Sequence, residues 1–331
     1  MPDTNPPSIL ITSAGRRVEL VQLWINSVKK IIGPNAKVYA NDLNPSLSAA
    51  CHLADQAFEI CRCTDPSYPA QLLEQCLNHG VRLVIPTIDT ELIALSEARD
   101  SFEAAGVNLV VSDSSLVRKC RNKHLTADLF KSLSINTPAI LDPAKLTFPC
   151  FVKPIDGSCS QGVKPIKSTS ELCSADINNP NNLFQELVPK DWIEYTADLY
   201  YSKSSVLLAC VPRQRLETRG GEISKGITRR DAIYHYLRNH LSFIHGARGV
   251  ITVQVFTNPN RNQVLGIEFN PRFGGGYPMS HAAGVDYPTM LIKEYLLNES
   301  LPNMDNWQSD LLMLRYDAMV IAKEIYSITL P

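Results

Sequence analysis

Residues 267–276 of this 331-residue chain read IEFNPRFGGG and place a carboxylate and an amide two residues apart. In an extended strand such residues point to the same side, so Glu268 and Asn270 present oxygen atoms to one face. Hard oxygen ligands of this kind suit magnesium bound together with substrate phosphates. Gln254, in the preceding segment TVQVF, adds an oxygen if the two strands pair, and Arg272 continues the face with a guanidinium that can hold a phosphate. A solvent-facing strand side is the alternative, which the three following glycines disfavour because they let backbone approach a ligand closely.

Two lysines upstream supply positive charge. Lys153 ends the short apolar stretch FVKP, and Lys123 lies on an expected helix. An ammonium group within an apolar strand needs an anion nearby, so each lysine indicates either triphosphate binding or a structural ion pair. Residues 156–163 (DGSCSQGV) follow as a small-residue loop. Within it, Ser158 and Gly162 can offer hydroxyl and backbone donors to a phosphate.

A third polar cluster lies in residues 184–198, FQELVPKDWIEYTAD. Glu186 and Val188 stand where an expected strand gives way to a connection, and Glu194 opens the strand after it. Backbone groups at such a crossing can hydrogen-bond an adenine, and a carboxylate can hold a ribose. Only together with the other segments does this cluster indicate a nucleotide site.

Alternating strands and helices are expected to position these residues. The N-terminal pattern predicts a parallel sheet with helices on both faces, from strands at 8–12, 37–40, 82–85 and 107–111 and helices at 17–32 and around 91–95. Right-handed crossovers place any ligand along the edge where the strands end. The first turn reads TSAGRR and lacks the GxGxxG pattern of a dinucleotide site.

From about residue 114 the pattern changes to helices mixed with antiparallel strands. The expected elements are a helix at 115–133, an extended segment at 147–154, strands near 183–188, 195–201 and 206–211, a polar loop at 217–226, a helix at 231–245, strands at 250–256 and 263–270, and a helix at 288–298. The fold class is therefore α/β and α+β. An N-terminal parallel α/β domain at 1–112 precedes a two-lobed domain divided into 113–190 and 191–331.

Bulk composition narrows the class of protein. Hydrophobic residues make up 44% and charged residues 20%, while 32 Lys and Arg nearly cancel 33 Asp and Glu. A nucleic-acid platform would show a basic excess, so nucleic acid is not an expected partner. No run of about eighteen apolar residues predicts a membrane helix, and the first residues, MPDTNPPS, lack signal-peptide features, so a cytoplasmic location is expected. The nine cysteines contain no CxxC pair and are expected to be reduced thiols, with Cys159 set apart by its place in the small-residue loop.

Taken in order, these segments resemble the ATP-grasp superfamily and, within it, one synthetase unit of the carbamoyl-phosphate synthase large chain. The resemblance runs from about residue 8 to about residue 298 and rests on ILITSAGRR, PTIDTEL, FVKP, QELV, TVQVF and IEFNPRFGGG. It implies a pre-ATP-grasp domain at 1–112, followed by the small and large lobes of an ATP-grasp domain. The chain departs from the pattern at Ser158, Cys159 and Ser160, where glycines are often found. It also has only one unit, so carbamoyl-phosphate synthase activity is not expected.

The resemblance further implies ATP and Mg²⁺, which Mn²⁺ can replace, as cofactors. The implied nucleotide contacts are Lys123, Lys153, Ser158, Gly162, Glu186, Leu187, Val188 and Glu194. The implied metal ligands are Gln254, Glu268 and Asn270. The implied catalytic residues are Arg272, at the transferring phosphoryl group, and Lys225, in a flexible cover over the triphosphate at 217–226.

The expected reaction activates a carboxylate as an acyl phosphate, which an amine or similar nucleophile attacks, with release of ADP and phosphate. Arg213 and Arg215 are interpreted either as ligands of the substrate carboxylate or as ion-pair residues, and His281 either as a general base or as a structural histidine. Two other classes stay open: a non-catalytic ATP-binding sensor or assembly subunit on the same fold, and a nicotinamide-dependent oxidoreductase using residues 8–112. Expected partners are small-molecule carboxylate and nucleophile substrates and no membrane, while a homodimer stays open.

Overall fold

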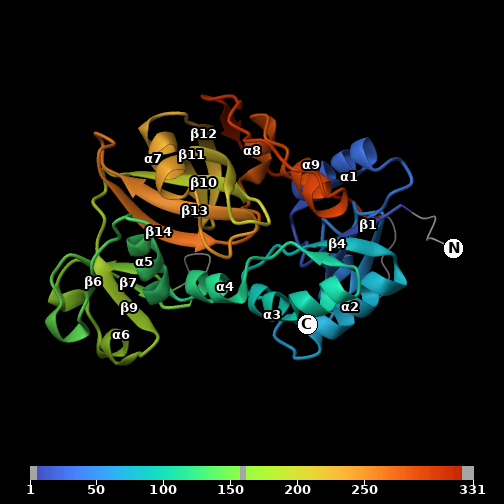
Figure 1. The fold of residues 1–331 in the computed structure, drawn as a ribbon. Coiled ribbons are helices and arrows are strands. Elements are labelled where there is room, and N and C mark those ends of the chain that lie inside the picture. The colour runs from blue at the N-terminus through green and yellow to red at the C-terminus, as the bar shows by residue number, and fades with distance from the viewer. Residues whose placement is uncertain (1–5, 157–161, 323–331) are drawn as a thin grey trace.

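The structure, a computed structural model, describes residues 6–156 and 162–322, and within them the chain forms three sheets. Figure 1 shows the N-terminal sheet and its helices on the right, a small lobe at the lower left and a large antiparallel sheet above that lobe. No helix in these two ranges combines the length and the apolar character needed to cross a membrane.

Five parallel strands form the N-terminal sheet in the order β3-β2-β1-β4-β5. Their bounds are β1 Ser8–Ile11, β2 Val38–Asp42, β3 Gln56–Glu59, β4 Val81–Ile85 and β5 Asn108–Leu109. The accompanying helices are α1 Val18–Ile31, α2 Tyr68–Asn78 and α3 Leu92–Ala104, with a short turn at Pro45–Leu47. The predicted parallel sheet is confirmed. The sequence pattern does not predict β3, because this edge strand exposes both of its end residues and carries little apolar sequence.

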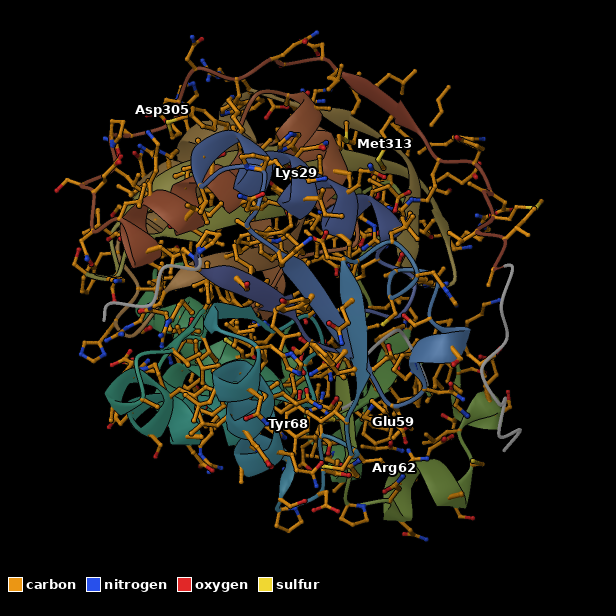
Figure 2. All side chains as sticks on the ribbon, turned by 90° about the vertical axis from the view of Figure 1, so that its right-hand side faces the viewer. Lys29, Glu59, Arg62, Tyr68, Asp305 and Met313 are labelled. Atoms are coloured by element: carbon orange, nitrogen blue, oxygen red, sulfur yellow. The ribbon has the colours of Figure 1, made fainter. Side chains whose placement is uncertain are left out.

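Helix α1 packs between the N-terminal sheet and the C-terminal helices α8 (Tyr277–Ala282) and α9 (Tyr287–Leu291). Its buried residues recur at three- and four-residue intervals and form one apolar stripe that includes Leu20, Val21, Trp24 and Val28. The ring of Trp24 meets that of Phe273 edge-on, with centroids 6.4 Å apart. Figure 2 shows Lys29 of this helix on the side of the sheet nearer the C-terminal elements, with Tyr68 of α2 on the opposite side.

The small lobe contains a four-stranded antiparallel sheet in the order β6-β9-β7-β8. Its elements are α4 Ser114–Arg121, α5 Lys123–Ser132, β6 Ile140–Leu141, β7 Cys150–Pro154, β8 Lys164–Ile166, α6 Ser174–Asn178 and β9 Asn182–Glu186, with turns at Pro143–Lys145 and Thr169–Glu171. The single helix expected at 115–133 is interrupted at Asn122. The backbone there is extended, and the Asn122 side chain accepts hydrogen bonds from the N–H groups of His124 and Leu125. Asn122 therefore caps a new helix and places Lys123 at its first position.

The large unit is built on a six-stranded antiparallel sheet in the order β14-β13-β10-β11-β12-β15. The strands are β10 Ile193–Tyr201, β11 Leu207–Arg219, β12 Glu222–Thr228, β13 Gly249–Thr257, β14 Val264–Asn270 and β15 Leu312–Leu314. The helices are α7 Ala232–His240, α8 Tyr277–Ala282 and α9 Tyr287–Leu291, the last continuing as a π-helical turn at Ile292–Leu296. The helices expected at 231–245 and 288–298 therefore end earlier than their patterns indicate.

The polar segment 217–226 is a hairpin and not a loop. Strands β11 and β12 pair as far as Arg219 and Glu222, so Gly220 and Gly221 alone turn the chain. Both glycines have positive φ, 58° and 78°, as a two-residue hairpin turn requires. The polar side chains mask the strand pattern, and the Gly-Gly pair is the signal that indicates the turn.

Apolar packing ties the small lobe to the large sheet through helix α5. The ring of Phe130 stacks on that of Phe269 of β14, with centroids 4.3 Å apart. Gly266 makes this approach feasible, since a Cβ there would lie 2.4 Å from the Phe130 ring. A larger core runs from the N-terminal sheet into the large sheet, and a separate one lies under α2 and α3. The Phe130 contacts hold helix α5, whose first residue is Lys123, against the large sheet.

Candidate active site

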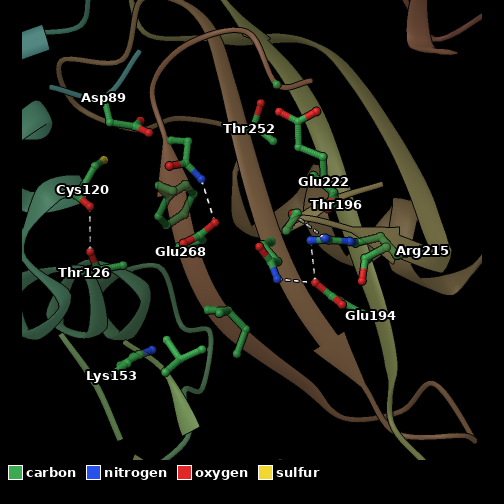
Figure 3. Close-up of a pocket in the computed structure, with 18 of the residues that line it drawn as sticks. Asp89, Cys120, Thr126, Lys153, Glu194, Thr196, Arg215, Glu222, Thr252 and Glu268 are labelled. Atoms are coloured by element: carbon green, nitrogen blue, oxygen red, sulfur yellow. Dashed lines mark hydrogen bonds and ion pairs between the residues drawn. The ribbon is translucent and has the colours of Figure 1, made fainter. Parts of the chain in front are cut away.

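A cavity of about 900 Å³ opens where the three units meet. Its size lies near the upper end of the range for small-molecule sites. Two groups of charged and polar residues line it, as Figure 3 shows with Lys153 and Asp89 at opposite ends. We call the part bounded by Lys123, Lys153, Glu194, Gln254, Glu268 and Asn270 the lysine end, and the part bounded by Arg17, Asp89, Glu222 and Arg272 the arginine end.

The oxygen-bearing row at the lysine end comes from paired strands. Gln254 of β13 stands opposite Glu268 of β14, so the strand pairing on which the metal prediction depends is present. Asn270 donates from Nδ2 to Glu268 Oε1 at 2.9 Å, and Gln254 donates from Nε2 to Glu194. Both amides thus use nitrogen in these bonds and keep an oxygen available. One carboxylate and two amide oxygens fit a magnesium ion whose other ligands are phosphate oxygens and water.

This row differs from a site made of protein ligands alone. Among the residues that the structure describes, no group of three or more His, Cys, Asp or Glu side chains is arranged to hold a metal. A cation at Glu268 would therefore depend on oxygen atoms supplied by a bound ligand.

Two buried lysines face this row. The Lys153 side chain projects from β7 with 8% of its surface exposed, and within the described ranges its ammonium has no hydrogen bond or ion pair. Burial, followed by the nearby charge of Lys123, lowers the pKa of Lys153 to about 8, against the opposing effect of Glu268. Burial also lowers the pKa of Lys123, whose Nζ lies 3.4 Å from the carbonyl oxygen of Ile155. Two repelling ammonium groups in one buried space favour an anion between them.

Glu194 is held at the side of the lysine end by Arg215. Arg215 Nη1 lies 2.7 Å from Glu194 Oε1, and its Nη2 donates to the carbonyl oxygen of Gly221 at 2.9 Å. Burial raises the pKa of Glu194, against the opposing effect of Arg215. The carboxylate is therefore tied both to the oxygen row, through Gln254, and to the turn of the β11–β12 hairpin.

The predicted adenine segment is only partly at the cavity. Leu187 and Val188 line it, whereas the Glu186 side chain is exposed and its neighbour Gln185 lines the wall instead. Adjacent residues of a strand point to opposite faces, so Gln185 and Glu186 cannot both face inward. The Glu186 amide already donates to the carbonyl oxygen of Ala139 at 2.8 Å.

The structure describes only the two ends of the small-residue loop, residue 156 and residues 162–163. Ser158 and Cys159 lie outside the described residues. Gly162 has a φ of +69°, and a Cβ there would lie 3.1 Å from Pro154. It does not itself line the cavity, although the next residue, Val163, does.

At the arginine end, two guanidinium groups meet around one carbonyl. Arg272 Nη1 and Arg17 Nη1 both donate to the carbonyl oxygen of Phe273, at 3.1 and 3.3 Å. Arg272 Nη2 also donates to Asp89 Oδ2 at 2.8 Å, and Arg17 Nη2 to the carbonyl oxygen of Thr87 at 2.7 Å. Burial, followed by the charge of Arg272, lowers the pKa of Arg17 to about 10. Arg272 is predicted from the sequence, whereas Arg17 and Asp89 are not, although both lie in segments that carry the family resemblance, TSAGRR and PTIDTEL.

A buried carboxylate fixes the loops that carry Arg17 and Asp89. Glu91 is fully buried and accepts from the amides of Thr87 and Ile88 at 2.7 and 3.0 Å. It also accepts from the hydroxyls of Ser13 and Tyr68, at 3.0 and 2.7 Å. The loops after β1 and β4 are thereby joined at one point, at the C-terminal edge of the parallel sheet where ligands of such sheets bind.

Arg213 lies beneath both ends and is already paired. It is 1% exposed and binds Asp198 through both terminal nitrogens, and Asp198 also accepts from Ser280 Oγ at 2.6 Å. Gly276 covers the guanidinium so closely that a Cβ would lie 2.5 Å from Arg213 Nε. Of the two roles considered for Arg213 and Arg215, the geometry therefore favours ion pairs, which in both cases are part of the cavity wall.

The structure does not bring Lys225 to the cavity. Its ammonium pairs with Glu217 at 2.8 Å on the outer side of the hairpin. Register shifts between Arg215 and Thr218 change which residues face inward, so Thr218 lines the cavity while Glu217 faces outward. His281 is also outside the wall, with Nδ1 3.7 Å from Asp286 Oδ1.

Comparison with protein families accounts for both parts of this site. Residues 9–110 match a model described as PylC-like, N-terminal domain, and residues 120–276 match one described as ATP-grasp domain. The chain contains an ATP-grasp domain. Every residue that defines the lysine end and the arginine end lies within these two matches. A comparison with curated protein sequences gives no match.

Solved structures share the fold of this ATP-grasp chain. The biotin carboxylase domain of 2-oxoglutarate carboxylase from Hydrogenobacter thermophilus, in complex with MgADP, ADP and bicarbonate, is 14% identical with a TM-score of 0.70, covering 94% of this chain and 74% of that chain. N5-carboxyaminoimidazole synthetase from Staphylococcus aureus is 16% identical with a TM-score of 0.67, covering 90% and 78%. L-amino acid ligase from Bacillus licheniformis is 15% identical with a TM-score of 0.65, covering 89% and 75%.

Pyruvate carboxylase from Rhizobium etli is 13% identical with a TM-score of 0.69. The match covers 93% of this chain but spans only 30% of that much longer one. At these identities the likeness concerns the fold.

Proposed function

We propose that this chain is an ATP-dependent ligase, which activates a carboxylate as an acyl phosphate for attack by an amine or a similar nucleophile. The observation that carries the proposal is the meeting of Lys123 and Lys153 with the row of Gln254, Glu268 and Asn270 across one buried space. A triphosphate would neutralise the two lysines. A magnesium ion held between the phosphates and Glu268 would supply further neutralisation of the triphosphate charge.

The nucleotide has a direction in this cavity. Phosphates at the lysines and Glu268 point the reacting end toward Arg272, while the base lies against Leu187 and Val188. The ribose then reaches Glu194, a carboxylate that lines the cavity and is held there by Arg215 and Gln254. Binding a ribose hydroxyl at Glu194 requires sharing with, or displacement of, one of these two partners.

The arginine end supplies the place for the acid. A carboxylate oxygen attacks the γ-phosphorus, and the bond from that phosphorus to the ADP oxygen breaks. Arg272, aligned by Asp89, neutralises negative charge on the transferring oxygens. The amine next attacks the acyl carbon, the bond to phosphate breaks, and the amine loses a proton. Solved carboxylases and ligases share the fold of this chain. One of them was solved with MgADP and bicarbonate bound.

The test is release of ADP by the purified chain with MgATP across a set of carboxylates, including bicarbonate and amino acids, each with and without amines. The expected result is release that needs a particular acid, together with a product whose mass equals acid plus nucleophile minus water. Release of ADP with no acid, or none with any acid despite tight MgADP binding, would contradict the ligase. The second of these results would favour the nucleotide sensor.

A further inference from the structure

The arginine end carries charges of both signs. Arg17 and Arg272 line it together with Asp89 and Glu222. All four side chains line one cavity, and the pKa of Arg17 is lowered by Arg272 and raised by Glu222 and Asp89. Figure 3 shows the Asp89 and Glu222 carboxylates facing that space from opposite sides. A site for a simple anion has no need of two carboxylates in its wall, because each would repel the ligand.

The two carboxylates are held differently. Asp89 Oδ2 accepts from Arg272 at 2.8 Å and so aligns that guanidinium. Glu222 is held from outside the cavity wall, by Arg16 on the N-terminal unit at 3.3 Å and by Arg315 on the C-terminal segment at 3.1 Å. Arg16 is 78% exposed, so this pair is a weak surface interaction. Asp89 therefore serves Arg272, whereas Glu222 presents an oxygen-bearing edge to the cavity.

Glu222 is ionised and lines the cavity beside a glycine. Burial favours its neutral form, but Arg16, Arg315 and Arg17 together outweigh burial and lower the pKa of Glu222 below its ordinary value. The neighbouring residues 274–276 are all glycine, and a Cβ on Gly275 would lie 3.0 Å from the Glu222 carboxylate. Any larger residue at this position would crowd the carboxylate. A charged acceptor with a bare backbone beside it can receive a small cationic group.

We propose that the activated acid is a zwitterion of the α-amino acid type, whose carboxylate lies at Arg272 and whose ammonium group lies at Glu222. This inference rests on the proposed ligase function and names its substrate class. An acid without an amino group, or bicarbonate, meets the guanidinium but leaves Glu222 facing it as a like charge. A dicarboxylate places its second negative charge against Asp89 or Glu222. An amino acid satisfies both signs at once.

The test compares acids that differ only in the amino group: L-alanine with propionate, L-leucine with isocaproate and L-glutamate with glutarate. ADP release is measured with MgATP, and binding is measured by thermal stabilisation in the presence of MgADP. For at least one pair, the wild-type chain is expected to favour the amino acid by about 100-fold, the order of one hydrogen bond to a charged group. In Glu222→Gln this preference falls below about tenfold, while MgADP affinity stays within about twofold because Glu222 is remote from the lysines.

Two variants separate recognition from architecture. Glu217→Gln changes a carboxylate of the same hairpin that faces outward, and it should keep the wild-type preference. Arg16→Ala breaks the contact between Glu222 and the N-terminal unit but leaves the carboxylate in place, and it should also keep the preference. If Arg16→Ala behaves like Glu222→Gln, Glu222 is only a connection between the units and the proposal is overturned.

The results of this test distinguish failure of the zwitterion proposal from failure of the ligase proposal. If ADP release fails with every acid but amino acids still stabilise the MgADP complex in a Glu222-dependent way, the substrate class stands and the ligase assignment falls. If bicarbonate or the acids without amino groups support release as well as the amino acids do, the ligase stands and the zwitterion is wrong. If no amino acid binds or reacts, the zwitterion is likewise wrong.

Discussion

The lysine end and the arginine end of the cavity are assembled by different means. At the lysine end, Gln254 and Glu268 lie opposite each other on paired strands, and Asn270 follows on the same strand as Glu268. At the arginine end, Arg17 and Asp89 come from loops of the N-terminal unit, whereas Glu222 comes from a hairpin of the large unit. The first arrangement depends on one sheet, and the second on how two units pack. Substitutions at the two ends should therefore have separable effects, on the nucleotide at one and on the choice of acid at the other.

The largest expected effect comes from Glu268→Gln at the lysine end. This change replaces the only carboxylate of the predicted metal row by an amide, and the three neutral amide oxygens then present do not balance the charge of a divalent ion. ADP release should fall by about 10³-fold, the order expected when one preorganised charged group at the reaction centre is lost. The loss should be equal for every acid, because the acid contacts the other end.

Steady-state ADP release at saturating Mg²⁺ measures this effect, and a melting temperature close to that of the wild type shows that the fold is retained. Glu217→Gln serves as the matched control, since it changes an exposed carboxylate outside the cavity. Unchanged turnover in Glu268→Gln would remove the metal assignment. A loss confined to some acids would contradict the separation of the two ends.

The same contrast explains what can be predicted from the sequence. Glu268 and Asn270 stand two residues apart on β14, and period-two alternation turns that spacing directly into a shared face. The parallel N-terminal sheet is predicted for a similar reason, because apolar runs such as Ser8–Ile11 recur between helical patterns. Local periodicity is thus sufficient wherever a single element or a strand pair builds the feature.

Features that depend on contacts between distant segments are not predicted. Asp89 matters because it meets Arg272, which is 183 residues away along the chain. Glu222 faces the cavity because a Gly-Gly turn and shifted strand pairing place it there. Asn122 interrupts a helix whose apolar pattern continues on both sides, because its side chain satisfies the first amides of the next helix.

An intermediate effect is expected from Lys153→Met. The side chain keeps its approximate volume but loses the ammonium, so ATP affinity should fall by about 10- to 100-fold at pH 7 with the preference among acids unchanged. Isothermal titration calorimetry with ATP and with a non-hydrolysed analogue measures the change. Equal nucleotide affinity in the variant would contradict a phosphate contact at Lys153.

The pH dependence of binding gives Lys153 a second, independent signature. In the free protein its pKa is about 8, and bound phosphates favour the charged form and so raise that pKa. Affinity should therefore be constant below pH 8, decline as the pH rises through 8, and level off only above the raised pKa of the complex. Lys153→Met should lack this decline. A wild-type affinity that stays flat between pH 7 and pH 9.5 would show that Lys153 does not contact the phosphates.

The smallest expected effect belongs to Lys225→Ala, and it decides whether the hairpin contributes a catalytic residue. The Lys225 and Glu217 side chains are 50% and 53% exposed, and such surface pairs contribute about 0.2–1 kcal/mol to stability. Turnover should therefore stay within about twofold of the wild type, since neither charge faces the cavity. A loss above tenfold would mean that the hairpin changes its pairing when nucleotide binds and turns Lys225 inward. That result would restore the role implied by the family resemblance, and it would join the two ends through the strand that carries Glu222.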